Sequence, residues 1–251
     1  MKTSELVAET RAILDDHSSM VVGKPDELWS NERILRYLNH AQTVMCREGW
    51  VLMDDTTATC CEITLVEDQA TYALHKSVLG VLSAKLSDSD LGLGRRNWGH
   101  LHPLPPPDPD YWDTNRTLIF DPGRPQLYAV DPATSKLELW RKPDATSALL
   151  TLQLRVARLP LTTLSLDADS TPEVKEEYHL DFCGFAAGSL LSRTVNNDAV
   201  EGTSNAAVIA GRGMIKDFNA VVEKARKARE RLMVGMPRYR FTQWGGDYYG
   251  Y

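Results

Sequence analysis

The feature that most constrains the fold of this chain is the order of its sequence patterns. Helical spacing of apolar residues comes first, strand-like alternation follows, and helical spacing then returns. The first pattern predicts a helix over about residues 3–16. A second helix is expected after Ser30, a residue type that caps helices, with Trp29 packing on Ile34 across the cap and Gly49 marking the end.

Two more helices are predicted in the C-terminal part. The third begins near Ser170, which together with Glu173 has the spacing of a capping box; alternatively, Thr171 caps the helix with Pro172 in the first turn. The fourth spans about residues 205–233. It contains Gly211 and Gly213, and each glycine weakens a helix by roughly 1 kcal/mol relative to alanine. These glycines are tolerable in a helix if another backbone passes close to them.

The middle of the chain, residues 56–166, is rich in strand patterns. Short aliphatic and aromatic runs are separated by Asp-Pro and Pro-Asp turn signals. The predicted strands are residues 60–66, 71–74, 78–82, 117–120, 126–130, 136–140 and 150–156. This spacing predicts an antiparallel β-sandwich or barrel, inserted between the second and third helices.

These patterns predict an α+β fold in three parts. Residues 1–55 and 167–234 supply the N- and C-terminal helices of one helical bundle domain. Residues 56–166 form the inserted β-rich domain, in which residues 87–116 form a long proline-rich loop. Residues 235–251 are an extended C-terminal arm.

The sequence contains no recognisable catalytic or cofactor motif, so we expect neither an enzyme nor a cofactor. Metalloprotease, hydrolase and nucleotide-binding patterns are absent from it. Cys46, Cys60, Cys61 and Cys183 lack zinc or redox spacing and are expected to be free thiols in a reducing compartment. No apolar run has the length of a membrane span, and the N-terminus lacks the apolar stretch of a signal peptide.

Two groups of residues resemble metal or catalytic sites but fit poorly. His100 and His102 have no recognisable third ligand, and the acidic run at 108–115 departs from calcium-loop spacing. His179 and Cys183 stand one helical turn apart, where a core thiol beside a hydrogen-bonded histidine is the better interpretation than a catalytic pair. We therefore predict no metal site and no catalytic residue.

A carbohydrate- or receptor-binding module on the β insertion is the alternative function. Its candidate residues are Tyr72, Tyr128 and Trp140, whose rings would line a sugar-binding face. Their strand spacing favours the core of the β domain instead. Glycan binding by the purified protein would support this alternative.

Charge is distributed unevenly along the chain, whose net charge is −6. Residues 1–68 hold thirteen acidic and six basic residues, whereas residues 212–240 hold nine basic and three acidic residues. Oppositely charged ends suit head-to-tail contacts between copies of the chain, or contacts with other proteins. Taken singly, these charges are equally compatible with solvent-exposed helix faces.

The C-terminal arm is the candidate functional site. It has too few aliphatic residues and too many glycines to form a core of its own. Aromatic rings left in water are an apolar liability, and aromatic residues and arginine commonly anchor interfaces. We predict that the arm docks on another subunit, the alternatives being a tail that folds back on its own domain and a tail that is disordered. The predicted docking residues are Arg238, Tyr239, Arg240, Phe241, Trp244, Tyr248, Tyr249 and Tyr251.

Several segments, taken in order, resemble the head-to-tail connector or adaptor proteins of tailed bacteriophages, which include the tail tubular protein and head-completion adaptors. Residues 29–42 resemble the second-helix signature of that family, in which a tryptophan and a cap precede an acidic turn, a Leu-Asn pair and an alanine. The other matching segments are residues 123–130, 137–144, 159–161 and 172–179. The resemblance covers most of the chain.

This resemblance implies a structural virion protein. Such adaptors form a ring, commonly dodecameric, between the portal and the tail, and the ring is part of the DNA channel. The implied partners are copies of the same chain, the portal protein, the tail nozzle or other tail proteins, and genomic DNA in transit, with no membrane. The implied location is the head–tail interface of the virion, with the host cytoplasm during assembly. Docking on the portal would be the role of the arm.

Overall fold

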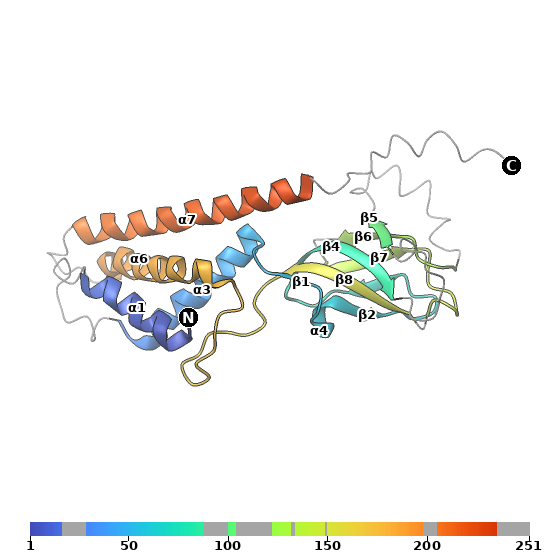
Figure 1. The fold of residues 1–251 in the computed structure, drawn as a ribbon, viewed down its shortest axis with the longest axis horizontal. Coiled ribbons are helices and arrows are strands. Elements are labelled where there is room, and N and C mark those ends of the chain that lie inside the picture. Colours follow the sequence, from blue (N-terminus) through green and yellow to red (C-terminus); the bar gives the residue numbers. More distant parts are fainter. Residues whose placement is uncertain are drawn as a thin grey trace.

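The structure is a computed structural model that describes residues 1–16, 29–87, 100–103, 122–131, 134–148, 150–197 and 205–234. The long helices gather at one end of the molecule, whereas the strands and the short helix α4 lie at the other (Figure 1). The α-helices are α1 (Thr3–Asp16), α3 (Asn31–Gly49), α4 (Ala58–Cys61), α6 (His179–Asn197) and α7 (Asn205–Val234). The chain is therefore a mixed α and β protein, as predicted.

The strands form a sheet with antiparallel pairing throughout, except for one parallel pair, β5 and β6. They are β1 (Met53–Asp54), β2 (Glu62–Thr64), β3 (Thr71–Ala73), β4 (Val78–Ser87), β5 (His100–Pro103), β6 (Leu127–Asp131), β7 (Lys136–Trp140) and β8 (Thr151–Arg158). Their order is β1-β8-β4-β5-β6-β7-β3, and β2 also pairs with β8. Buried side chains of β3, β6 and β7 share one core with those of β4 and β8. The sheet therefore curves around that core, but the described strands do not close into a barrel, which was one of the two predicted arrangements.

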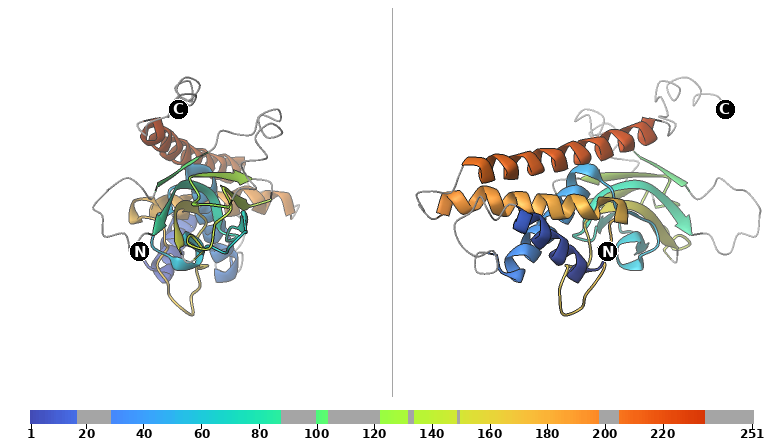
Figure 2. Two further views of the ribbon diagram at one scale, coloured as in Figure 1. Left: turned by 90° about the vertical axis from the view of Figure 1, so that its right-hand side faces the viewer. Right: turned by 60° about the vertical axis from the view of Figure 1, so that its left-hand side comes forward.

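The long helices share a second core. α6 packs against α1, α3 and α7, so it lies at the centre of the group. α7 runs along one side of α6, and α1 lies on the opposite side (Figures 1 and 2). Leu38 of α3 and Phe182 of α6 are both fully buried in this core. Helices from the two ends of the chain are thus held together by one apolar interior.

The start of α3 follows the sequence prediction closely. The Ser30 side chain accepts a hydrogen bond from a backbone N–H in the first turn, which satisfies a donor that the helix itself leaves free. Trp29 and Ile34, the pair expected to meet across the cap, both lie in the helical core. The helix ends after Gly49, but the left-handed residue at its end is Trp50, with a φ of 51°.

Close packing between α6 and α7 depends on a pair of glycines. A Cβ placed on Gly211 would lie 2.7 Å from the carbonyl oxygen of Gly188, and a Cβ on Gly188 would lie 2.7 Å from the carbonyl oxygen of Gly211. The backbone of α6 therefore passes close to Gly211. It is not present at Gly213, where a Cβ would meet nothing within 4 Å.

Two sequence predictions for the β region are corrected, and one strand was missed. Cys60 and Cys61 end the short helix α4 instead of starting a strand, because the carbonyl of Thr57 accepts hydrogen bonds from both of their backbone N–H groups. β1 was not predicted. Residues 100–103 form β5 inside the predicted loop, because β4 provides an edge on which Leu101 pairs and becomes buried. The predicted strand at residues 117–120 lies outside the described residues.

The predicted start of the third helix is also wrong. A 3₁₀ turn, η2 (Glu176–Tyr178), comes first, and α6 begins only at His179. The proposed capping pair is not formed, because the Glu173 carboxylate accepts hydrogen bonds from Arg158 and from the backbone of Leu161. The backbone carbonyl of Ser170 instead accepts a hydrogen bond from α1.

No helix in the described ranges combines the length and the apolar character that a membrane crossing would need. The long α7 carries charged residues along its exposed side. α6 is more apolar, but its buried residues belong to the core shared with the other helices.

The glycine crossing generates the first prediction. Gly211→Ala should lower the free energy of unfolding by about 1–2 kcal/mol, because overpacking against a backbone costs up to about 3 kcal/mol and alanine returns only about 1 kcal/mol of helix propensity. Gly213→Ala on the same helix is the matched control and should stabilise the protein by roughly 0.5–1 kcal/mol. Urea denaturation measures both, and equal effects of the two substitutions would contradict the close crossing.

Candidate functional site

The predicted docking residues of the arm, residues 235–251, lie outside the described residues. The structure therefore places none of Arg238, Tyr239, Arg240, Phe241, Trp244, Tyr248, Tyr249 and Tyr251. It does describe α7 up to Val234, the residue that precedes the arm. This end of α7 lies towards the sheet (Figure 1).

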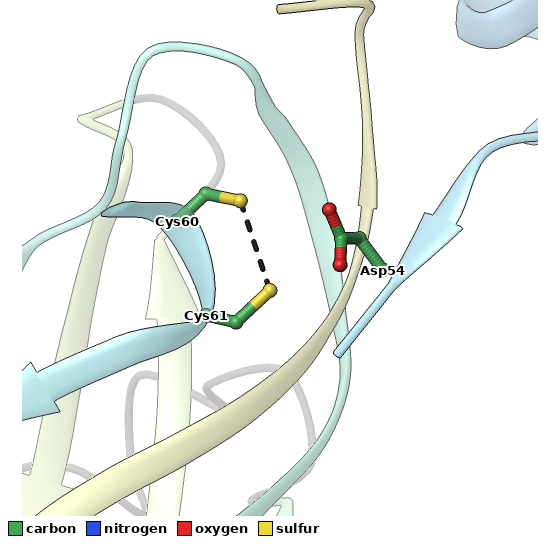
Figure 3. A group of neighbouring side chains, drawn as sticks. All are labelled: Asp54, Cys60 and Cys61. Atoms are coloured by element: carbon green, nitrogen blue, oxygen red, sulfur yellow. Dashed lines mark hydrogen bonds between the residues drawn. The ribbon is translucent and has the colours of Figure 1, made fainter. Parts of the chain in front are cut away.

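One group of side chains has the composition of a metal site. The ligand atoms of Asp54, Cys60 and Cys61 all lie within 4.8 Å of one another, and all three residues are buried. Figure 3 shows the two thiols facing each other, with sulfur atoms 3.7 Å apart, and the carboxylate of Asp54 beside them. The group comes from the end of β1 and the short helix α4.

The chemistry of this group argues against a metal centre. Burial, followed by the hydrogen bond with Cys60, raises the pKa of the Cys61 thiol to about 12, whereas a metal ligand must be a thiolate. Among the residues that the structure describes, the group also has no fourth ligand to complete a tetrahedral structural site. In addition, the Asp54 carboxylate is already occupied by other donors.

The Asp54 carboxylate instead accepts hydrogen bonds from the turn that follows it. Its Oδ1 accepts hydrogen bonds from the backbone N–H groups of Thr56 at 2.9 Å and Thr57 at 3.1 Å. Its Oδ2 accepts from the Thr57 hydroxyl at 2.6 Å and from Arg158 Nε at 2.6 Å. Burial alone would raise the pKa of Asp54, but the hydrogen bonds from Thr57, Thr56 and Arg158 outweigh it and hold the pKa well below its usual value.

Arg158 joins Asp54 to a second carboxylate. Its Nη1 lies 2.5 Å from Oε2 of Glu173, and the side chains of Arg158 and Asp54 are only 8% and 6% exposed. The other oxygen of Glu173 accepts hydrogen bonds from the backbone N–H groups of Leu161 and Thr162. Burial opposes ionisation of Glu173, but the hydrogen bonds from Arg158 and Thr162 lower its pKa. We call Asp54, Arg158 and Glu173 the junction triad.

The junction triad lies where the chain passes between helices and sheet. After α3 the chain leaves the helices and enters β1, which pairs with the end of β8. After β8 the chain returns to the helices, passing from Arg158 through Glu173 towards α6. The backbone N–H of Arg158 also donates to the carbonyl of Leu52, which lies just before β1. One guanidinium group thus ties both passages of the chain together.

Trp50 forms a second link across the same junction. Its ring occupies the space that a side chain at Gly80 of β4 would need, since a Cβ there would lie 2.7 Å from Trp50 Cη2. The guanidinium of Arg229, on α7, lies 4.6 Å from the centroid of the Trp50 ring. This cation–π contact connects the end of α7 to the sheet through the residue that caps α3.

The His179–Cys183 pair, one of the weaker candidates from the sequence, proves to be structural. His179 Nε2 lies 2.9 Å from the carbonyl oxygen of Val174, while Cys183 Sγ donates to the carbonyl of Leu6. Burial raises the pKa of Cys183 to about 11, which keeps the thiol protonated. Within the described part, His100 lies on β5, and the acidic run at 108–115 falls outside it.

Tyr72, Tyr128 and Trp140 are all buried, as the core interpretation predicted. The Tyr72 hydroxyl bonds to the backbone of Val66 and does not face solvent. Burial raises the pKa of Tyr128 to about 12. These aromatic side chains therefore offer no exposed platform for a sugar ring.

Sequence reasoning missed the junction triad, although one signal for it was present. Leu152, Leu154 and Val156 alternate on the buried face of β8, and Arg158 continues that register. An arginine at a buried position requires an acidic partner. The partners could not be identified from sequence, because Asp54 precedes Arg158 by 104 residues.

Comparison with known proteins adds one finding. A sequence model of the family described as SU10 adaptor protein matches residues 1–235. The match therefore includes every described helix and strand, from α1 to α7. No curated protein matches the chain significantly.

The junction triad generates the second prediction. Arg158→Met should lower the free energy of unfolding by about 3–5 kcal/mol, because it leaves buried carboxylates without their cation. The matched control is Arg155→Met on the exposed face of the same strand, which should change stability by no more than about 0.5 kcal/mol. Similar denaturation midpoints for the two variants would refute the structural role of the triad.

The pKa directions generate the third prediction. Asp54 and Glu173 have lowered pKa values in the folded protein, so their stabilising contribution is complete above the unfolded values of about 4. That contribution declines as the pH falls below the unfolded values, and it is fully lost only below the lower folded values. The Asp54→Asn/Glu173→Gln variant should therefore lose less stability than the wild type between about pH 5 and pH 3. Urea midpoints at each pH provide the measurement, and parallel losses would contradict the assignment.

Proposed function

Because the chain belongs to the SU10 adaptor protein family, a family of phage head–tail adaptors, we propose that it is a structural adaptor that joins the head and tail of a phage virion. The observation that carries this proposal is the match over residues 1–235, which spans both the helices and the sheet. An adaptor acts by contact with other proteins of the head and tail. We therefore propose a structural, non-enzymatic role within the virion.

The adaptor is proposed to be a ring, dodecameric as the resemblance implies, through which genomic DNA passes. The uneven charge of the chain supports contacts between unlike faces of neighbouring copies. The net charge of −6 also suits a channel, because each phosphate contact adds to the affinity for DNA and would retard ejection. Assembly would take place in the host cytoplasm before the ring joins the virion.

The proposed domains are a helical bundle from residues 1–55 and 167–234 and an inserted β domain from residues 56–166, built as a sandwich. Two separate hydrophobic cores, one among the helices and one within the sheet, support this division. The junction triad and Trp50 would hold the two domains in a defined relation. A rigid relation suits a protein that must align two large assemblies.

Residues 235–251 are proposed to be the portal-docking arm. Their aromatic and arginine content supports this role, since such residues dominate binding energy at interfaces. Arg238 and Arg240 would pair with portal carboxylates, and Trp244 would be the main anchor. The tail nozzle or another tail protein would bind elsewhere on the ring. The carbohydrate-binding alternative loses its main support, because its candidate aromatic residues are buried.

Truncation of the arm tests this proposal. A variant ending at Gly235 should fold and melt like the full chain but should no longer join the portal in electron micrographs. In the full chain, Trp244→Ala should weaken portal binding about tenfold or more, since a hot-spot residue is typically worth about 2 kcal/mol. Thr242→Ala in the same arm is the control and should bind normally. Unchanged portal affinity of the truncated protein would show that another surface docks, and failure of the full chain to bind portal or tail proteins would reject the adaptor role itself.

A further inference from the structure

The outer faces of α1 and α7 point away from the helical core on opposite sides. Both helices pack on α6, which lies between them (Figures 1 and 2). Each outer face carries exposed residues at helical spacing. An adaptor subunit in a ring needs two different surfaces, one for each neighbour, and these faces are on the correct sides to supply them.

The α7 stripe consists of Ile209, Arg212 and Lys216, which share the outer face of α7. Ile209 is 68% exposed, which makes it the most exposed large apolar side chain in the described part of the chain. The ion pairs of α7 within the described residues all lie between residues 223 and 230, so Arg212 and Lys216 have no acidic partner there. The stripe is an apolar side chain followed by two available cations.

The α1 stripe consists of Glu5, Glu9 and Ala12, which share the outer face of α1 and are exposed. Glu5 accepts a hydrogen bond from the backbone N–H of Lys2, and no ion pair engages Glu9 in the described structure. Ala12 offers a small side chain over which a larger one can pack. The α1 stripe therefore has two acidic side chains and one small apolar side chain.

We propose that the α7 stripe of one copy packs on the α1 stripe of the next copy, with Ile209 over Ala12. Arg212 then lies beside Glu9, and Lys216 lies beside Glu5. The inference rests on the ring proposed above and assigns the contact that builds it. The partner is a second copy of this chain.

The spacing of the two stripes supports this register. From Ile209 the cations follow after three and then four residues, and from Ala12 the acids precede by three and then four residues. The two series match only if the helices run in opposite directions. Within one copy, α1 starts next to residue 170, close to the start of α6, and α7 runs back along α6 (Figure 1). A ring axis along the helices preserves these directions, so α7 of one copy meets α1 of the next in antiparallel orientation.

The charges also exclude the symmetric alternatives. A two-fold dimer through the α7 stripe would bring Arg212 and Lys216 against their own copies, and a dimer through the α1 stripe would oppose two sets of acids. Only unlike faces are complementary, and unlike faces generate a ring when the rotation closes. The ion pairs at the edge would determine register and orientation more than affinity, while Ile209 would supply the apolar contact.

Charge reversal in the full-length protein tests the proposed interface. Arg212→Glu/Lys216→Glu should lose ring assembly, or need about tenfold more protein for it, in the presence of portal. Glu5→Lys/Glu9→Lys should fail in the same way. A mixture of the two variants should restore rings, because each mismatched face then finds a complementary one. Lys76→Glu/Lys136→Glu, which makes the same charge change on the exposed surface of the sheet region, is the control and should assemble normally.

A disulfide trap gives an independent measurement. Ala12→Cys/Ile209→Cys should form intermolecular disulfides upon oxidation, because α6 separates the two positions within one copy, whereas Ile209→Cys alone should not form ladders. Native-like assembly of the charge-reversed variants, or the absence of cross-links in wild-type-like rings, would overturn this interface while leaving the adaptor role intact. Failure of the wild type to form any ring with portal would reject the proposed ring and this interface together.

Discussion

The arrangement of this protein depends on one buried guanidinium group. Arg158 lies at the end of β8 with its side chain almost fully enclosed, and a charge in that position is tolerated only if acidic partners meet it with good geometry. Asp54 and Glu173 do so from the outgoing and returning passages of the chain. Because a guanidinium is planar and its donors are fixed, it determines the orientation of both passages as well as their proximity.

The remaining connection between helices and sheet uses an aromatic ring. Trp50 adopts a left-handed backbone conformation at the end of α3, which turns the chain towards β1 and places the ring between Gly80 and Arg229. An arginine stacked on this ring links the last turns of α7 to the sheet. Packing in the junction therefore holds the last turns of α7, whereas the rest of the helix is held by α6.

These features suit a protein that functions by contact. Its buried groups are engaged in structure: burial raises the pKa values of the Cys46, Cys61 and Cys183 thiols. Hydrogen bonds lower the pKa values of Asp54 and Glu173. In the described part of the chain, the exposed stripes on the outer faces of α1 and α7 differ in charge. In an adaptor of the SU10 family, rigidity at the junction and unlike outer faces would serve the same purpose, which is to transmit a defined geometry from one assembly to the next.

By itself, the sequence determined the elements whose signals are local. The ranges of α1 and β7 and the cap of α3 follow from apolar periodicity, alternation and a serine at the correct position, because these depend only on neighbouring residues. The tertiary structure decided whatever depends on distant partners. The start of α6 moved to His179 because Glu173 is bound by Arg158, β5 formed because β4 offered an edge, and Gly211 met a backbone that Gly213 does not. The register of β8 marked Arg158 as buried, but only the folded chain brought Asp54 and Glu173 to it, since pairing across such separations is set by packing and not by local pattern.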